Sequence, residues 1–331
     1  MDPAPTTTPL GRNGLVSTPR LVDRGDLVFL AYLLLPFGLF LQLGRLAGWT
    51  EMILRPRARR GVRANLQRAF GASKSARELD RLTRQVFEGH QTRILLVAAV
   101  PLLVADGTLE SEFPIEGLEH LDRAIAAGKG ALILGSHVNS IGGLLAMVRL
   151  RKLGYDVRVP MPDPVDAWPL TLFRRAVHRV LKLQSVSELL GALYVQFNVR
   201  PLMRLLDQGS IVLLMGDGWH SASFVDAEFL GRRLPFTNGP LSVARLAGVP
   251  VVQMFALGRP DKLRFELEPA FTVEKSADSV ADIEVAVRRY VARVEARMLE
   301  TIPSWQHWMV EDLFGSLERW RSLPLHERYH V

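Results

Sequence analysis

The sequence LILGSH, residues 132–137, places a histidine directly after a short run of apolar residues. A continuous apolar run of this length is typical of a strand that is buried on both faces of a sheet. Two further runs have the same character, IVLLMGD at 211–217 and VPVVQMFAL at 249–257. Helical patterns alternate with these strands, so the sequence predicts an α/β fold whose mixed sheet is mostly covered by flanking helices.

His137 is the first candidate for chemistry because the ends of strands in α/β sheets are where ligands bind. Its imidazole ordinarily titrates near neutral pH, so it can remove a proton from a hydroxyl or amine that attacks a thioester carbonyl. A histidine without a known partner also occurs in purely structural roles. The motif therefore indicates a general base only together with further evidence.

Composition narrows the classes of protein that the sequence can represent. The 331 residues are 48% apolar, which argues against a disordered chain, and the net charge of +7 favours an anionic partner. An anionic membrane, an acidic carrier protein or nucleic acid would satisfy this charge. Basic and aromatic residues do not interleave, which argues against nucleic acid.

The chain has no cysteine, so disulfides, thiolate catalysis and cysteine-ligated zinc are excluded. No metal site is predicted.

Residues 27–43 (LVFLAYLLLPFGLFLQL) form an apolar segment without a charge. As a helix it would be roughly 25 Å long, slightly short of the hydrocarbon core of roughly 30 Å. Pro36 and Gly38 permit a kink. We therefore expect a membrane-anchoring helix that either spans the bilayer or inserts into one leaflet. A buried core helix is the alternative.

The charges that flank this segment predict its orientation. Arginines dominate the residues that follow it, against Glu51 alone: Arg45, Arg55, Arg57, Arg59, Arg60, Arg63 and Arg68. The positive-inside rule then places the C-terminal bulk on the cytoplasmic face of the inner, or plasma, membrane. The expected organisation is a disordered lead-in at 1–20, a membrane anchor at 21–56 and an α/β domain at 57–331. Residues 169–183 form a second, basic amphipathic helix that suits either a membrane surface or ordinary packing.

Several motifs in this order resemble the lipid A biosynthesis (lauroyl/myristoyl) acyltransferase family, within the lysophospholipid-acyltransferase-like superfamily. The most specific is FLGRRLPFTNGPLSVARLAGVPVV at 229–252. The others are the apolar anchor with its arginine-rich continuation, Asn65-Leu66 with Phe70, Gly117-Leu118-Glu119, Gly128-Lys129-Gly130, the strand before His137, residues 205–217, Pro303, and Trp305-Gln306-His307-Trp308. The resemblance implies acyl transfer from acyl carrier protein or coenzyme A to a lipid-like acceptor, with no other cofactor.

The resemblance also implies that an acid five positions after the histidine assists it. Here that position is Gly142. An orienting carboxylate can contribute several powers of ten to the rate in other histidine systems, so another acid is expected to replace it. Asp217 at a strand end, Asp226 and Glu228 are candidates, and Asp226 is preferred.

The remaining predicted residues concern substrates and rival mechanisms. Arg232 and Arg233 suit an anionic acceptor or the phosphopantetheine of the carrier, because guanidinium groups match phosphate oxygens. The substrate-binding candidates are Asn139, Ser140, Glu228, Arg232, Arg233 and Thr237. Val138-Asn139-Ser140-Ile141-Gly142 also resembles a nucleophile elbow except at its first position, so an acyl-enzyme on Ser140 is one alternative. A non-catalytic relative that binds lipid or carrier protein is another.

Overall fold

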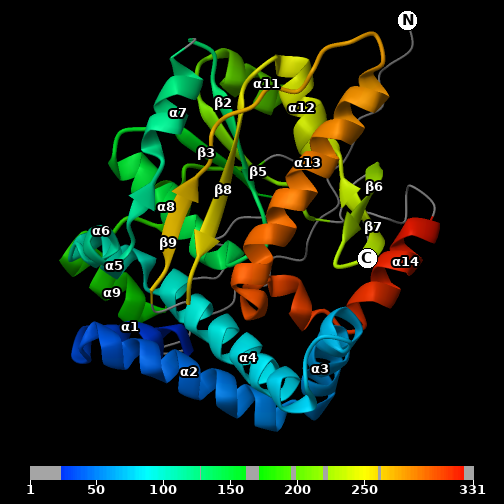
Figure 1. Ribbon diagram of the computed structural model, residues 1–331. Coiled ribbons are helices and arrows are strands. Elements are labelled where there is room, and N and C mark those ends of the chain that lie inside the picture. The colour runs from blue at the N-terminus through cyan, green and yellow to red at the C-terminus, as the bar shows by residue number, and fades with distance from the viewer. Residues whose placement is uncertain are drawn as a thin grey trace, which may run out of the picture.

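The computed structural model describes residues 24–126, 128–161, 171–194, 199–218, 223–259 and 262–323. The predicted lead-in at 1–20 lies outside these residues. Within them, seven strands form one sheet in the order β1-β9-β8-β2-β5-β3-β4 (Figure 1). The strands are β1 (Ile115–Glu116), β2 (Ala131–Gly135), β3 (Val157–Met161), β4 (Ala192–Tyr194), β5 (Ile211–Met215), β8 (Val251–Leu257) and β9 (Arg264–Leu267).

The sheet is mixed, as the sequence predicts, and most of its neighbouring strands are parallel. Only the pair of β8 with β9 is antiparallel among these neighbours. Every residue of β2 and β8 is buried, because the sheet is covered on both faces. Alternate residues of β2 enter opposite cores: Leu132 and Leu134 pack into one, Ala131 and Ile133 into the other. The apolar runs of the sequence thus reflect burial on two sides.

Helices cover both faces of this sheet. Those on one face include α7 (Leu118–Ile125) and α8 (Ser140–Lys152), and those on the other include α11 (Arg200–Asp207), α12 (Gly239–Ala247) and α13 (Ser279–Glu300). The short helices α5 (Val100–Ala105), α6 (Thr108–Glu112) and α10 (Val186–Leu190) complete the first side. A separate hairpin of β6 (Phe224–Phe229) and β7 (Arg232–Thr237) packs beside α13.

The N-terminal helices lie across the end of the sheet at which β8 terminates (Figure 1). The apolar segment is divided at Pro36 into α1 (Arg24–Leu34) and α2 (Phe37–Leu54). α3 (Pro56–Phe70) follows, and α4 (Ala76–Ala98) begins with a capping box formed by Ser75 and Glu78. Among the residues described here, no helix combines the length and the apolar character needed to cross a bilayer.

α2 packs closely along α4 because two glycines face it. A Cβ atom on Gly44 would lie 2.7 Å from the Cα of Thr92, and one on Gly48 would lie 2.4 Å from the carbonyl oxygen of Phe87. α1 and α2 also expose large apolar side chains: Leu27, Leu30, Leu33, Leu34, Leu39, Leu43, Leu46, Trp49, Ile53 and Leu54.

The predicted basic amphipathic helix is present as α9 (Leu172–Leu181), and it adjoins α1. Arg174 and Thr171 bind the buried carboxylate of Asp26, and the ring of His178 stacks on Phe29. None of the α9 residues is buried. Its apolar side chains at Leu172, Val180 and Leu181 are exposed, like those of α1 and α2.

The described part of the chain ends in three short elements. They are the 3₁₀ helices η1 (Ile302–Ser304) and η2 (Gln306–Met309), and α14 (Leu313–Ser322). Trp305 lies between η1 and η2, and an isolated antiparallel bridge joins it to Val138. The segment that contains His307 is thereby held against the residues that follow β2.

Candidate active site

The sheet brings His137 and Asp217 together. β2 and β5 are parallel neighbours in which Gly135 pairs with Met215. His137 and Asp217 each lie two residues beyond that pair, so the register places them side by side at the carboxyl edge of the sheet. Asp217 is completely enclosed, whereas the His137 side chain is 25% exposed. The histidine is therefore the member of the pair that a substrate can reach.

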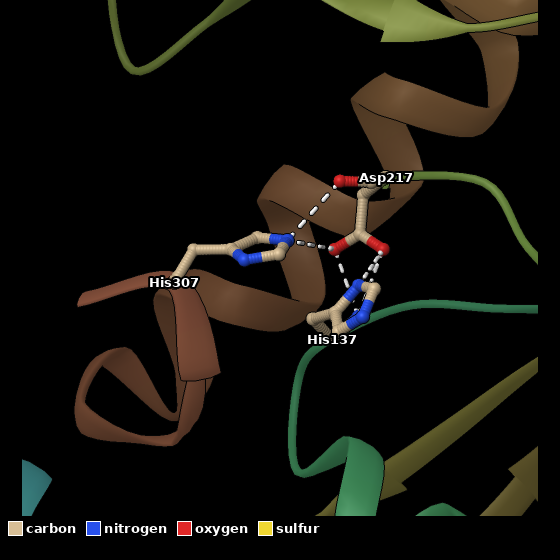
Figure 2. Close-up of side chains that lie close together, drawn as sticks. All are labelled: His137, Asp217 and His307. Atoms are coloured by element: carbon tan, nitrogen blue, oxygen red, sulfur yellow. Dashed lines mark hydrogen bonds and ion pairs between the residues drawn. The ribbon is translucent and has the colours of Figure 1, made fainter. Parts of the chain in front are cut away.

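The Asp217 carboxylate is held by several hydrogen bonds (Figure 2). His137 Nδ1 lies 2.7 Å from Oδ1, and the backbone N–H of His137 donates to both carboxylate oxygens at 2.9 and 2.8 Å. Trp305 Nε1 donates to Oδ2 at 3.1 Å. These donors fix the orientation of the carboxylate. They also favour the His137 tautomer with a proton on Nδ1, which leaves the lone pair of Nε2 ready to accept a proton.

Charge coupling shifts the pKa values of both groups. Burial alone would raise the pKa of Asp217, but the charge and hydrogen bonds of His137, with a smaller effect of His307, lower it to about 2. Burial would lower the pKa of His137, but the charge and hydrogen bond of Asp217 outweigh this and raise it above its ordinary value. The aspartate is thus ionised at neutral pH, and the histidine is a stronger base than a free imidazole.

His307 forms a third part of this site. Its Nε2 lies 3.1 Å from the backbone oxygen of Asp217 and 3.8 Å from Oδ2, and its ring centroid is 4.3 Å from that of His137. In the sequence, His307 was noted only as part of the motif Trp305-Gln306-His307-Trp308. The structure places it at the carboxylate. His307 thus contacts both the backbone and the side chain of Asp217, and this limits the movement of Asp217.

Among the described residues, the same three side chains form the one cluster whose ligand atoms lie close enough together to hold a metal ion. His137, Asp217 and His307 offer ligand atoms that all lie within 4.8 Å of one another. A cation bound there would have to replace the contact between His137 Nδ1 and Asp217 Oδ1. The hydrogen-bonded pair therefore fits a proton-transfer role better than a metal centre.

Gly142 lies where the resemblance implies an acid, and it packs against the core. A Cβ atom on Gly142 would lie 2.7 Å from Cδ1 of Leu263, which is itself buried in the core. The side chain would point into apolar packing on α8. Asp217 on the neighbouring strand supplies a carboxylate to His137 from another direction.

Asn139 and Ser140 belong to the start of α8, and both have structural partners. Asn139 is fully buried and has a left-handed φ of 50°. Its amide donates to the backbone oxygens of Ala256 and Gly258 at 2.9 and 3.1 Å, and its Oδ1 accepts from Arg93. The Ser140 hydroxyl donates to the side-chain oxygen of Gln306. The Ser140 hydroxyl is therefore hydrogen-bonded to Gln306 and not to His137.

The other predicted residues lie together on the β6–β7 hairpin rather than beside His137. Asp226, the preferred acid, is 3.8 Å from Arg233 across the two strands, so the structure pairs His137 with Asp217 instead. Arg232 reaches the backbone oxygen of Arg68 and the ring of Phe314. Glu228 is exposed, and the Thr237 hydroxyl accepts from the backbone of Gly239. The hairpin reaches the site through Phe229, whose ring is 5.1 Å from that of Trp305.

Two contributors were not predicted for the site, Trp305 and Tyr290. The Trp305 indole is buried and binds Asp217 directly. The Tyr290 hydroxyl donates to the backbone oxygen of Gly135 at 2.7 Å, and its ring fills the space beside Gly216. Trp305 belongs to the Trp-Gln-His-Trp motif, whose unusual composition was a usable signal. Tyr290 lies on an ordinary amphipathic helix, which gave no signal.

The fold and the site together define an α/β protein with a carboxylate-oriented histidine at the carboxyl edge of a parallel sheet. Residues 25–312 match the family model for bacterial lipid A biosynthesis acyltransferase, and the chain therefore belongs to this family. The family places the protein among acyltransferases that act on a lipid. A search of curated proteins found no match.

Proposed function

We propose that this protein transfers a fatty acyl chain from acyl carrier protein or acyl-coenzyme A to a hydroxyl or amine of a lipid or glycolipid acceptor. His137 is the general base in this proposal, and Asp217 is its orienting acid. The observation that carries the proposal is the contact of 2.7 Å between His137 Nδ1 and the buried carboxylate of Asp217. This contact supplies the carboxylate that Gly142 lacks.

The reaction can be written as a direct transfer. His137 Nε2 removes the proton from the acceptor as its oxygen or nitrogen attacks the thioester carbonyl. The tetrahedral intermediate then collapses, the carbon–sulfur bond breaks, and the thiolate takes the proton back from the imidazolium. Asp217 stabilises that imidazolium through the Nδ1 proton, without itself becoming protonated. No acyl-enzyme is required.

Membrane attachment at the cytoplasmic face of the inner membrane is part of the proposal. The exposed apolar side chains of α1 and α2 support insertion into one leaflet, and those of α9 lie on an adjoining helix. α9 also carries exposed basic residues, Arg175 and Arg179, which suit anionic headgroups. Insertion of this kind would bring a lipid acceptor to the end of the sheet where His137 lies.

The acceptor specificity is proposed only in chemical terms. The net positive charge of the chain favours an acidic carrier protein as donor and an anionic lipid as acceptor. Arg232 and Arg233 remain candidates for binding either one, since both are exposed on β7. Asn139 is a candidate for positioning, because its backbone and side chain fix the turn after His137.

The decisive experiment compares His137→Ala with His120→Ala in the purified full-length protein. Transfer of a labelled acyl group from acyl carrier protein and from coenzyme A to a lipid extract would be measured. We expect His137→Ala to lower transfer at least about 100-fold, the usual contribution of a general base, and His120→Ala to leave it unchanged. Transfer by His137→Ala within about threefold of the wild type would refute the base assignment.

The two alternatives, an acyl-enzyme on Ser140 and a non-catalytic relative, predict different results with the same acyl thioesters. Mass spectrometry after incubation with the acyl thioester alone would detect an acyl-enzyme, and a stable adduct on Ser140 would contradict direct transfer. A wild-type protein that binds acyl thioesters and lipids but transfers nothing from either donor would instead favour the non-catalytic relative.

A further inference from the structure

A cavity of about 450 Å³ lies between α2, α4 and η1, apart from the pair of His137 and Asp217. Four arginines line it, Arg45, Arg84, Arg93 and Arg259, and Glu88 is the one acidic residue on its described walls. Glu88 is already paired with Arg84. The cavity is therefore strongly positive, and an anion is the ligand that its charge favours.

Arg93 is the unusual member of this group. Its side chain is only 1% exposed, yet its Nε has no hydrogen-bond partner. Among the described residues, Arg93 donates a hydrogen bond from a terminal nitrogen to the neutral Oδ1 of Asn139 at 3.0 Å. It has no carboxylate partner among these residues. Burial lowers the pKa of Arg93 to about 10, which still leaves it charged at neutral pH. A buried guanidinium without a counterion is costly, and a bound anion would remove that cost.

The cavity is joined to the candidate active site by short contacts. Asn139, which Arg93 holds, comes two residues after His137, and its backbone N–H donates to the oxygen of Ser304 at 2.8 Å. Ser304 lines the cavity, and Arg259 follows β8, the strand beside β2. A molecule bound in the cavity therefore shares a wall with the turn that carries His137.

The rim of the cavity has a different character from its floor. Leu46 and Trp49 line it, and both are largely exposed on the apolar side of α2. The close packing at Gly44 and Gly48 fixes how α2 meets α4 along this wall. A positive interior beside an apolar rim suits an amphipathic molecule with a phosphate group.

We propose that this cavity binds the phosphate ester of a substrate, with Arg93 as its buried counterion. The inference rests on the proposed function for the identity of the substrate. Two sources share the chemistry: the headgroup of a phosphorylated lipid acceptor and the 4′-phosphopantetheine arm of the donor. Guanidinium groups bind both through paired hydrogen bonds to phosphate oxygens.

Calorimetric binding to the full-length protein in detergent tests this without turnover. The probes are two matched pairs, dihexanoyl phosphatidic acid with dihexanoylglycerol, and 4′-phosphopantetheine with pantetheine. We expect at least one phosphorylated member to bind about tenfold or more tightly than its phosphate-free partner. Preference within the lipid pair identifies the acceptor headgroup as the source, and preference within the pantetheine pair identifies the donor.

The variants separate the cavity from general charge effects. Arg93→Gln is expected to abolish the preference for phosphate. The double variant Arg45→Gln/Arg259→Gln changes only the less buried walls of the cavity, and it should weaken binding of the phosphorylated probe at least about tenfold. It tests the inference independently if Arg93→Gln does not fold. Arg288→Gln, on the exposed surface of α13, removes an equal charge per site and should have no effect.

His137→Ala distinguishes a failure of this inference from a failure of the proposed function. It should bind the phosphorylated probe as tightly as the wild type, because the cavity does not include His137. Equal binding of phosphorylated and phosphate-free probes by the wild type would overturn the inference, and so would unchanged binding in both arginine variants.

Discussion

Replacing Asp217 with asparagine keeps the volume of the side chain but removes the charge that His137 faces. Oδ1 accepts from the backbone N–H and Nδ1 of His137, while Oδ2 accepts from the same N–H and from Trp305 Nε1. Either orientation of the new amide therefore points an NH₂ group at a donor. If it points at His137, Nδ1 must become the acceptor, and Nε2 then carries the proton and cannot act as a base.

The expected loss of activity follows from this change of tautomer and from the lost stabilisation of the imidazolium. We expect the rate of acyl transfer to fall by about 10³ to 10⁴ in Asp217→Asn, the range for other histidines that lose an orienting aspartate. The pH profile should shift as well. In the wild type, the rate rises with pH through a His137 pKa that is higher than its ordinary value, because Asp217 favours the protonated ring.

Without that charge, burial is the remaining influence on His137 and lowers its pKa. The residual activity of Asp217→Asn should therefore reach its plateau at a lower pH than the wild type. Initial rates between pH 5 and 9 would be measured at saturating donor, with circular dichroism to verify that the variant is folded. Activity within about fivefold of the wild type, with the same midpoint, would refute the role given to Asp217.

Three further predictions concern the surroundings of this pair. Gly142→Asp in the Asp217→Asn background should not restore transfer, and it should lower the melting temperature more than Gly142→Ala does, because the new carboxylate would be buried against Leu263. The free energy of unfolding, from urea titrations, should reveal the lowered Asp217 pKa of about 2. Its contribution, about 2 kcal/mol, is present above pH 4 and is lost as the pH falls through 2, so the advantage of wild type over Asp217→Asn should shrink by about that amount between pH 4 and 2, below the range in which His137 titrates. Finally, prolonged dialysis against EDTA should leave transfer unchanged, whereas a loss that zinc restores would make His137, Asp217 and His307 metal ligands.

The strands and helices around the site could be predicted because each carries a local signal. The apolar runs that precede His137 and end at Asp217 became β2 and β5. The pairing of the two strand ends could not be predicted in the same way. Strand order depends on long-range packing, so the sequence left Asp217 and Asp226 as alternatives and preferred Asp226, whereas the structure places Asp217 beside His137 and Asp226 beside Arg233.

The N-terminal segment shows a different limit of sequence reasoning. Its apolar character was evident, and Pro36 was recognised as a possible kink. The structure begins a new helix directly after Pro36, with the proline itself in an extended conformation. Hydropathy alone counts apolar residues along the chain, and it does not record that Phe40, Leu41, Gly44 and Gly48 face the protein. That the remaining side chains contact a membrane stays a prediction.

The position of the acid also explains why a glycine is acceptable at 142. An acid on α8 would be oriented by the helix that follows His137, whereas Asp217 is oriented by the register of β2 and β5. That register is in turn held from the side, because the Tyr290 ring fits against Gly216 and its hydroxyl binds Gly135. Because the neighbouring strand already places a carboxylate at His137, position 142 is free to meet the requirement of the core, where any side chain would have to displace Leu263.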